Sequence, residues 1–531
     1  MRATDRERVL EQVVSRVTAN ELARADGERS LERVIYDTWY HERRRLEAEP
    51  RSREVGRVYA RWGRLLQELR LASETRQREL LRDIVREFAA EIVGHFDQRV
   101  YRIATRVLPV GLSAMLNALS PKILLAGFPH PPGVADRIII DGEVEQMRRL
   151  RARGTLILTP THLSHMDSIV TGYALHEIGL PPFTYGAGLN LFTNPLISFF
   201  MHNLGAYKVD RKKKADLYKE TLKEYATVTL ELGYDNLFFP GGTRSRSGAV
   251  EQHLKLGLLG AGLRAYVNNL LSRRLRPNIY IVPCTINYYL VLEAETLIDD
   301  YLKEAGKARY IIEDDESTRP ERVISFLRNL FQLDARIYLH FGRALDPFGN
   351  PVDDEGRSLD GNGRPIDIQR YTFVHGEPAH DAQRDAEYTR LLGEKLSEAF
   401  LRGNTVLPTH AVAFAAFELL ARRNRGLDLY RLLRARGRDR VLGLAELHEG
   451  VERLQRALER RAAAGGLRVG APLRAEDPEG VTADALRHFG IYHRRPVLTR
   501  RGDRVYPADM NLLLYYHNRL SRYGLEREVA P

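Results

Sequence analysis

The stretch TLILTPTHLSHMDSIVTGYALHEIG, residues 155–179, changes its pattern twice. It begins with an apolar run that predicts a buried strand and ends with the three- and four-residue periodicity of a helix. The turn between them, THLSHMD, carries two histidines and an aspartate. A strand, a turn and a helix in this order are typical of a parallel α/β sheet, whose sites lie beyond the C-terminal ends of the strands.

The same alternation continues on both sides of this stretch. Strands are expected over 137–140, 236–240, 278–286 and 335–342, and helices over 168–179, 215–232 and 251–271. We therefore predict an α/β core with a mostly parallel mixed sheet flanked by helices, plus helical N-terminal and C-terminal regions. The predicted organisation is a helical region 1–105, an α/β domain 106–345, a Gly/Pro/Asp-rich surface segment 346–385 and a helical region 386–531.

Composition restricts the partners. The 531 residues carry a net charge of +11, which favours an anionic partner such as a nucleic acid, an anionic membrane surface or a phosphorylated substrate. The basic clusters lack interleaved aromatic residues for base stacking, so no nucleic acid is expected. The single cysteine, Cys284, excludes an internal disulfide and is expected to be a buried, unreactive residue.

No apolar run is long enough for a spanning helix, and the N-terminus lacks the apolar core of a signal peptide. The most apolar segment, 107–129, is interrupted by two prolines and a lysine. It is expected to fill a core or to lie against a membrane from the side.

The spacing of His162 and Asp167 restricts how they can meet. Five positions on one helix would separate them by about 140° around the axis, so His162 must precede the helix. Asp167 could then orient the imidazole as a base for a hydroxyl group. Two other interpretations stay open: a metal site of His162, His165 and Asp167, which lacks an obvious further ligand, or a polar cap of the helix.

Two basic segments follow predicted strands. The loop FFPGGTRSRSG (238–248) combines glycines with Arg244 and Arg246, and its backbone amides and guanidinium groups suit a phosphate. It is not a Walker loop. In LGAYKVDRKKK (204–214), Arg211 at the strand edge is the candidate phosphate ligand, whereas a run of lysines is usually a solvated face. Each segment could also be a solvated basic turn.

The order of these motifs resembles the four blocks of the glycerolipid acyltransferase family. The blocks correspond to His162–Asp167, Gly205–Arg211, Phe239–Ser245 and Ile281–Pro283. The sequence around these blocks is more similar to the bacterial membrane-associated glycerol-3-phosphate acyltransferases. The segment LLLYYHNRL (512–520) resembles their C-terminal motif. The resemblance covers about 137–345, which would make 106–345 an acyltransferase catalytic domain.

The resemblance implies roles for individual residues. His162 would be the general base for the 1-hydroxyl of glycerol 3-phosphate, oriented by Asp167, and attack on an acyl thioester would be direct. The other implied positions are phosphate-binding Arg211, Arg244 and Arg246, the acceptor loop Gly241, Gly242, Thr243 and Ser245, and the acyl-pocket residue Pro283. No metal or other cofactor is implied, because acyl-CoA or acyl-carrier protein is the co-substrate.

One position departs from the family pattern. The third block usually contains a glutamate where this chain has Gly241, with Glu251 or Asp210 as possible substitutes. The expected function is glycerol-3-phosphate 1-O-acyltransferase, peripheral on the cytoplasmic face of the cell membrane and attracted to anionic lipid. The alternatives are acylation of lysophosphatidic acid or dihydroxyacetone phosphate, and a non-catalytic lipid-binding protein on a degenerate core. The sequence does not indicate an oligomeric state.

Overall fold

The computed structural model describes residues 3–25, 30–50, 52–103, 105, 137–189, 195–305, 336–435, 437–490 and 493–529. The apolar segment 107–129, expected in a core or at a membrane, lies outside the described residues. No helix within these ranges is long and apolar enough to cross a membrane.

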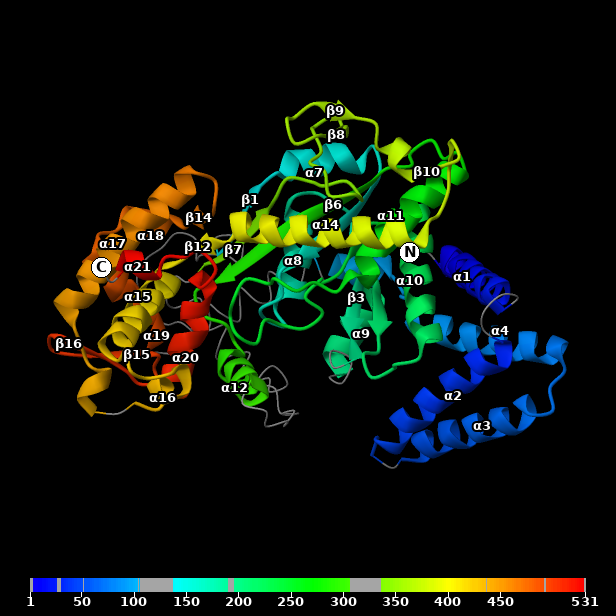
Figure 1. The fold of residues 1–531 in the computed structure, drawn as a ribbon, viewed down its shortest axis with the longest axis horizontal. Coiled ribbons are helices and arrows are strands. Elements are labelled where there is room, and N and C mark those ends of the chain that lie inside the picture. Colours follow the sequence, from blue (N-terminus) through cyan, green and yellow to red (C-terminus); the bar gives the residue numbers. More distant parts are fainter. Residues whose placement is uncertain are drawn as a thin grey trace.

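A seven-stranded sheet forms the centre of the molecule (Figure 1). Its order is β1-β7-β6-β2-β5-β3-β4, and only the β6–β7 pair is antiparallel. The predicted mixed, mostly parallel sheet is therefore confirmed. The strands are β1 (Ile138–Gly142), β2 (Thr155–Pro160), β3 (Thr184–Gly188), β4 (Ala206–Val209), β5 (Asn236–Leu237), β6 (Ile279–Tyr288) and β7 (Ile337–Phe341).

Both faces of the sheet are covered, which explains why β2 and β6 are buried along their whole length. Alternate residues of β2 enter different cores: Leu156 and Leu158 belong to one apolar cluster, and Ile157 belongs to another with α11 and α14. The flanking helices are α7 (Val144–Arg151), α8 (Asp167–Glu177), α9 (Pro195–Asn203), α10 (Asp216–Glu231), α11 (Leu256–Leu271) and α12 (Ala294–Ala305).

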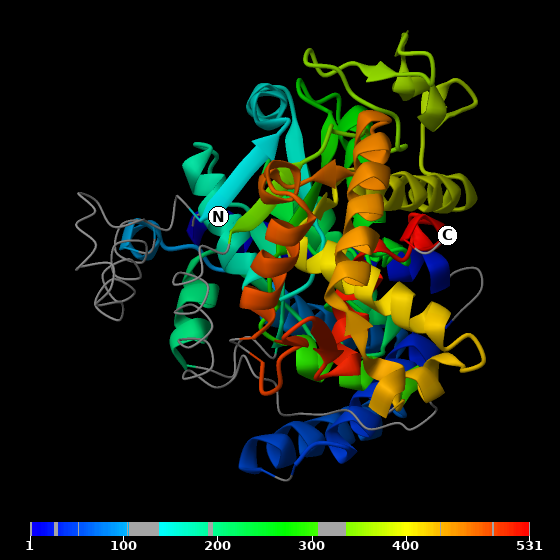
Figure 2. The same ribbon diagram turned by 90° about the vertical axis from the view of Figure 1, so that its left-hand side faces the viewer.

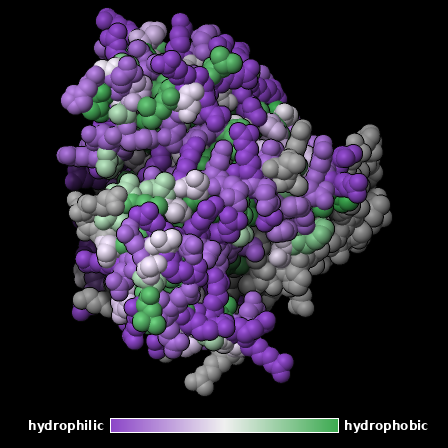
Figure 3. Space-filling model, turned by 90° about the vertical axis from the view of Figure 1, so that its right-hand side faces the viewer, coloured by the Kyte–Doolittle hydropathy of each residue, from purple (hydrophilic) through white to green (hydrophobic). Residues whose placement is uncertain are grey.

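The N-terminal helices pack beside β4 and α10, on the right of Figure 1. Arg16 of the first helix donates to both carboxylate oxygens of Glu231 at 2.7 Å, and aromatic residues of α10 complete the shared apolar cluster. The predicted helical N-terminal region is confirmed as α1 (Ala3–Ala25), α2 (Leu31–Glu47), α3 (Arg53–Leu69) and α4 (Glu74–Ile92). The outer face on this side is mainly hydrophilic, with scattered apolar residues (Figure 3).

The C-terminal region is also helical, as predicted, and Figure 2 views it from its own side. Short strands, β8 (Ser358–Leu359), β9 (Pro365–Ile366), β10 (Phe373–Val374) and β11 (Glu377–Pro378), lead into it. Its main helices are α14 (Ala382–Gly403), α15 (Pro408–Arg423), α16 (Leu429–Leu433), α17 (Leu444–Ala463), α18 (Ala471–Ala475), α19 (Pro478–Phe489), α20 (Met510–His517) and α21 (Glu526–Val529). Between them lie β12 (Thr405–Val406), β13 (Leu442–Gly443), β14 (Arg468–Val469), β15 (Leu498–Arg501) and β16 (Arg504–Pro507). The exact domain boundaries stay predictions.

Three local expectations differ from the structure. Strand β3, TYGAG, was not expected, because it is short and two of its residues are glycines. Helix α11 begins at Leu256 and not at 251, since the backbone N–H of Lys255 still donates to the carbonyl of Pro240. The strand expected over 278–286 runs two residues further and ends at Tyr288 as β6.

Candidate active site

The turn after β2 brings His162 and Asp167 together. His162 lies in the turn, and Asp167 is the first residue of α8. The two side chains therefore meet across the helix start, with His162 Nδ1 2.9 Å from Asp167 Oδ2. This is the geometry that the spacing required.

Asp167 is fully buried, and hydrogen bonds hold its carboxylate from several directions. Its Oδ2 accepts from the backbone N–H groups of Leu163 (2.7 Å) and Ser164 (2.9 Å) as well as from His162. Its Oδ1 accepts from the hydroxyl of Tyr288 in β6 at 2.6 Å. A carboxylate fixed in this way selects the tautomer with the proton on Nδ1 of His162. Nε2 has no hydrogen-bond partner among the described residues and is left to accept a proton.

The surroundings of His162 favour its neutral form. Burial lowers the pKa of the imidazole, the contact with Asp167 opposes this effect, and the charges of His165 and Arg244 lower the pKa further. The ring stacks on Phe239, with centroids 4.2 Å apart. A neutral, oriented imidazole can act as a general base at neutral pH.

His165 lies outside this pair. Its ring centroid is 6.5 Å from that of His162, and its backbone N–H donates to Glu293 Oε1 at 3.0 Å. Within the described part of the chain, no three His, Cys, Asp or Glu side chains are grouped to hold a metal ion.

The glycine–arginine loop is bonded directly to the histidine turn. The backbone N–H of Ser245 donates to the carbonyl of His162 at 2.7 Å, and the N–H of His162 donates to Glu251 Oε1 at 2.6 Å. Gly242 has a φ of 74°, a left-handed conformation that favours glycine, and Thr243 is exposed. Ser245 of the loop and Glu251 beyond it thus hold the backbone of His162 on both sides.

Arg211 and Arg244 belong to two separate segments, and their charges interact. Desolvation and then the charge of Arg244 lower the pKa of Arg211. The Arg211 side chain is exposed to solvent. Arg244 lies 3.4 Å from the buried carboxylate of Glu293, whereas no ion-pair partner of Arg211 is found among the described residues. Two guanidinium groups whose charges interact are suited to bind an anion.

The lysine run beside Arg211 is not uniformly solvated, as such runs usually are. Lys213 is buried, pairs with Glu91 at 2.5 Å and lies over the ring of Phe88, 4.6 Å from its centroid. Both partners belong to α4, so the N-terminal helices hold the loop that carries Arg211.

Arg246 forms an ion pair with Glu304 of α12 at 2.5 Å, and 41% of its side chain is exposed. Pro283 is buried within β6, next to Gly342 of the loop after β7. Cys284 is also buried, and burial raises the pKa of its thiol. The roles of Arg246 and Pro283 stay predictions.

The C-terminal motif reaches the same loop. Asn518 donates to the carbonyl of Ser247 at 2.9 Å, and the buried Arg519 donates to the carbonyl of Ile286 at 3.2 Å. A Cβ on Gly248 would lie 2.1 Å from the carbonyl oxygen of Tyr515, so the two backbones are in direct contact. LLLYYHNRL therefore packs on the arginine loop. Sequence reasoning had named this motif by resemblance but not its contacts.

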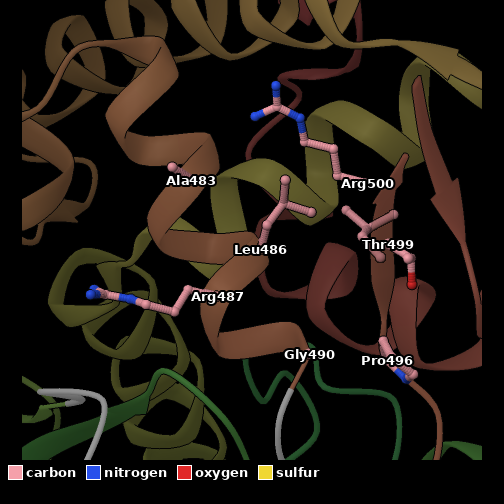
Figure 4. A pocket seen from close by; sticks show the side chains of 8 residues that line it. Ala483, Leu486, Arg487, Gly490, Pro496, Thr499 and Arg500 are labelled. Carbon is pink, nitrogen blue, oxygen red and sulfur yellow. The ribbon is translucent and has the colours of Figure 1, made fainter. Parts of the chain in front are cut away.

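A separate cavity of about 510 Å³ lies between α19 and β15 in the C-terminal region (Figure 4). Its lining includes Arg487 and Arg500 but none of the candidate site residues. The Arg487 guanidinium also pairs with Asp484 at 2.5 Å. This cavity is distinct from the His162 site.

Comparison with known proteins agrees with this geometry. A family model described as Acyltransferase matches residues 141–287, the segment that carries His162, Asp167 and both arginines. Over this segment the chain is therefore similar to acyltransferases.

Its relatives include glycerol-3-phosphate acyltransferases of Haemophilus ducreyi (35% identical over 38% of this chain and 23% of that protein) and Pseudomonas fluorescens strain Pf0-1 (29% identical over 51% and 29%). The matched region thus spans less than a third of these relatives. A solved 1-acyl-sn-glycerophosphate acyltransferase from Thermotoga maritima matches 47% of this chain and 90% of that chain, with 14% identity and a TM-score of 0.23.

Proposed function

We propose that this chain is a glycerol-3-phosphate 1-O-acyltransferase. It would transfer a fatty acyl group from acyl-CoA or acyl-carrier protein to glycerol 3-phosphate and form lysophosphatidic acid. One observation carries the proposal: a buried, neutral His162 oriented by Asp167 is bonded to the loop that supplies Arg244. The printed names of the relatives support the choice of acceptor.

The reaction needs no covalent enzyme intermediate. His162 Nε2 takes the proton of the 1-hydroxyl while that oxygen attacks the thioester carbonyl carbon. Collapse of the tetrahedral intermediate breaks the C–S bond, and the imidazolium returns its proton to the leaving thiolate. Asp167 stabilises the imidazolium in between, and Arg211 and Arg244 hold the acceptor phosphate in place.

A labelled acyl-transfer assay tests this proposal. Purified chain is mixed with palmitoyl-CoA and, separately, with glycerol 3-phosphate, dihydroxyacetone phosphate or lysophosphatidic acid. The expected product is lysophosphatidic acid from glycerol 3-phosphate. Preference for another acceptor would reassign the substrate, and a folded chain that acylates none of them would be a non-catalytic member of the family.

We predict that Arg211→Gln raises the KM for glycerol 3-phosphate. A charge-assisted hydrogen bond is worth about 1.5–3 kcal/mol, so the increase should be roughly 10- to 100-fold with a smaller change in kcat. Arg211 is the better test of the two arginines, because replacing Arg244 would also remove its ion pair with the buried Glu293. Steady-state kinetics with varied acceptor give both constants.

Lys214→Gln is the matched control, since Lys214 is an exposed cation on the same loop. It should leave the KM at the wild-type value. Equal effects of the two variants would mean that general positive charge, and not a phosphate contact, sets the KM.

We further propose that the protein acts as a peripheral protein on the cytoplasmic face of the cell membrane. With a net charge of +11 it should float with phosphatidylglycerol vesicles at low salt and be released at about 0.5 M salt, where charges are screened beyond a few ångströms. Phosphatidylcholine vesicles provide the control. Binding that is equal on both lipids and insensitive to salt would contradict an electrostatic attachment.

A further inference from the structure

The space beside Gly241 is filled by another residue. A Cβ built on Gly241 would lie 2.5 Å from Oε2 and 2.7 Å from Cδ of Glu251, far closer than any real contact. The backbone conformation does not demand glycine here, because Gly241, unlike Gly242, is not in the left-handed region. The Glu251 carboxyl group occupies the space that a side chain at 241 would need, so a larger residue there requires the Glu251 side chain to shift.

Glu251 is firmly anchored from outside the loop. Its backbone carbonyl accepts from Ser397 of α14 and from Arg522 near the C-terminus, both at 3.3 Å. Helix α11 begins only at Leu256, so Glu251 lies in the loop segment before this helix. The position of its backbone is thus set by two distant parts of the chain.

From this position Glu251 contacts the proposed base. Its Oε1 accepts from the backbone N–H of His162 at 2.6 Å, while the N–H of Ser245 binds the carbonyl of the same residue. Burial raises the pKa of Glu251 to about 8, an effect opposed in part by the hydrogen bond from His162 and the charge of Arg519. The carboxyl group is therefore mainly protonated at neutral pH, where it resembles a glutamine amide in size and in hydrogen bonding.

We propose that Glu251 is a positioning residue of the acyl-transfer site: its carboxyl group takes the space of the side chain that position 241 lacks and holds the His162 peptide in place. The inference rests on the proposed function. It also predicts that a glutamate introduced at 241 collides with Glu251 and impairs the site, unless Glu251 is shortened at the same time.

Four variants test this inference: Glu251→Ala, Glu251→Gln, Gly241→Glu and the exchange Gly241→Glu/Glu251→Ala. Misplacement of a reacting group by about 1 Å can cost roughly 100-fold, so Glu251→Ala should lower kcat about 10- to 100-fold with little change in the KM for palmitoyl-CoA. Glu251→Gln should recover most of that loss at pH 7, and the exchange should be faster than either Gly241→Glu or Glu251→Ala alone. Wild-type kcat in Glu251→Ala, or an exchange variant slower than both single variants, would overturn the proposal.

A second measurement separates this inference from the proposed function. Gly241→Ala should lower the Tm in the wild-type background and lower it much less in the Glu251→Ala background, because the collision is gone. If the wild-type chain transfers no acyl group, the proposed function fails, and the melting temperatures still decide on the pairing of Gly241 with Glu251. Additive Tm changes would overturn the pairing.

Discussion

A His162→Ala variant is expected to lose about 10³-fold in kcat, since general-base catalysis contributes about 10²- to 10⁴-fold. The reason is specific: Nε2 is the proton acceptor left over when Nδ1 donates to Asp167 at 2.9 Å. The KM for glycerol 3-phosphate should change little, because the proposed phosphate-binding arginines are not altered. Initial rates at saturating glycerol 3-phosphate and palmitoyl-CoA measure the loss.

The pH profile gives an independent check of the same base. Because burial lowers the pKa of His162, the imidazole stays neutral below the usual value of about 6.5. The wild-type kcat should therefore remain constant as the pH falls through 6.5 and should decline only in more acid solution. A decline centred above pH 7 would contradict a buried, neutral base.

His340 provides a matched control, since its Nδ1 lies 2.7 Å from the carboxylate of Asp141 in a second histidine–aspartate pair. That pair joins β7 to β1 and contacts Arg468 of the C-terminal region, and it touches none of the candidate site residues. His340→Ala should keep the wild-type kcat. Full activity in His162→Ala would refute the assignment of the base.

The features that were predictable from the sequence have local signals. The run TLILTP predicts a buried strand, and the spacing of His162 and Asp167 requires a turn before the helix; both are found in β2 and α8. The glycines and arginines of 241–248 indicate an anion-binding loop, and anion binding there stays a prediction. These conclusions need only neighbouring residues and the geometry of strands and helices.

The residues that sequence reasoning missed reach the site from far along the chain. Glu251, Tyr288 and Glu293 bond to the turn across separations of 89, 121 and 128 positions. Neither periodicity nor motif spacing predicts such contacts, because they depend on the order of the strands in the sheet and on the path of the loops between them. Glu251 had been considered only as a possible substitute for a missing carboxylate.

At Gly241 the sequence and the structure lead to opposite expectations. In the sequence it is a missing side chain, and the simplest test would have been to restore a glutamate there. In the structure the space is already occupied by Glu251, so restoring the glutamate alone should harm the site. The packing around Gly241 thus changes the expected effect of a glutamate at this position from restoring the site to impairing it.

An Asp167→Asn variant should be about as damaging as His162→Ala, with kcat lower by about 10²- to 10⁴-fold. The amide keeps the size of the carboxylate but loses the charge that stabilises the imidazolium, and its NH₂ group must face one of the donors that now bind Asp167. The contact with Asp167 raises the pKa of His162, so its loss lowers that pKa further. The acid limb of the remaining activity should accordingly move to lower pH, which a pH–rate profile of the variant measures.

Asp141→Asn is the control for this variant, because Asp141 accepts from the Nδ1 of His340 much as Asp167 accepts from His162. It removes the same charge from a histidine–aspartate pair outside the site and should leave both kcat and the acid limb unchanged. Thermal unfolding of both variants separates lost catalysis from lost structure: buried donors left without a carboxylate should lower the Tm of Asp167→Asn, yet the protein that remains folded should still be slow. Equal slowing by the two substitutions would mean that the carboxylate at 167 contributes only general stability. It would contradict the proposal that Asp167 orients His162.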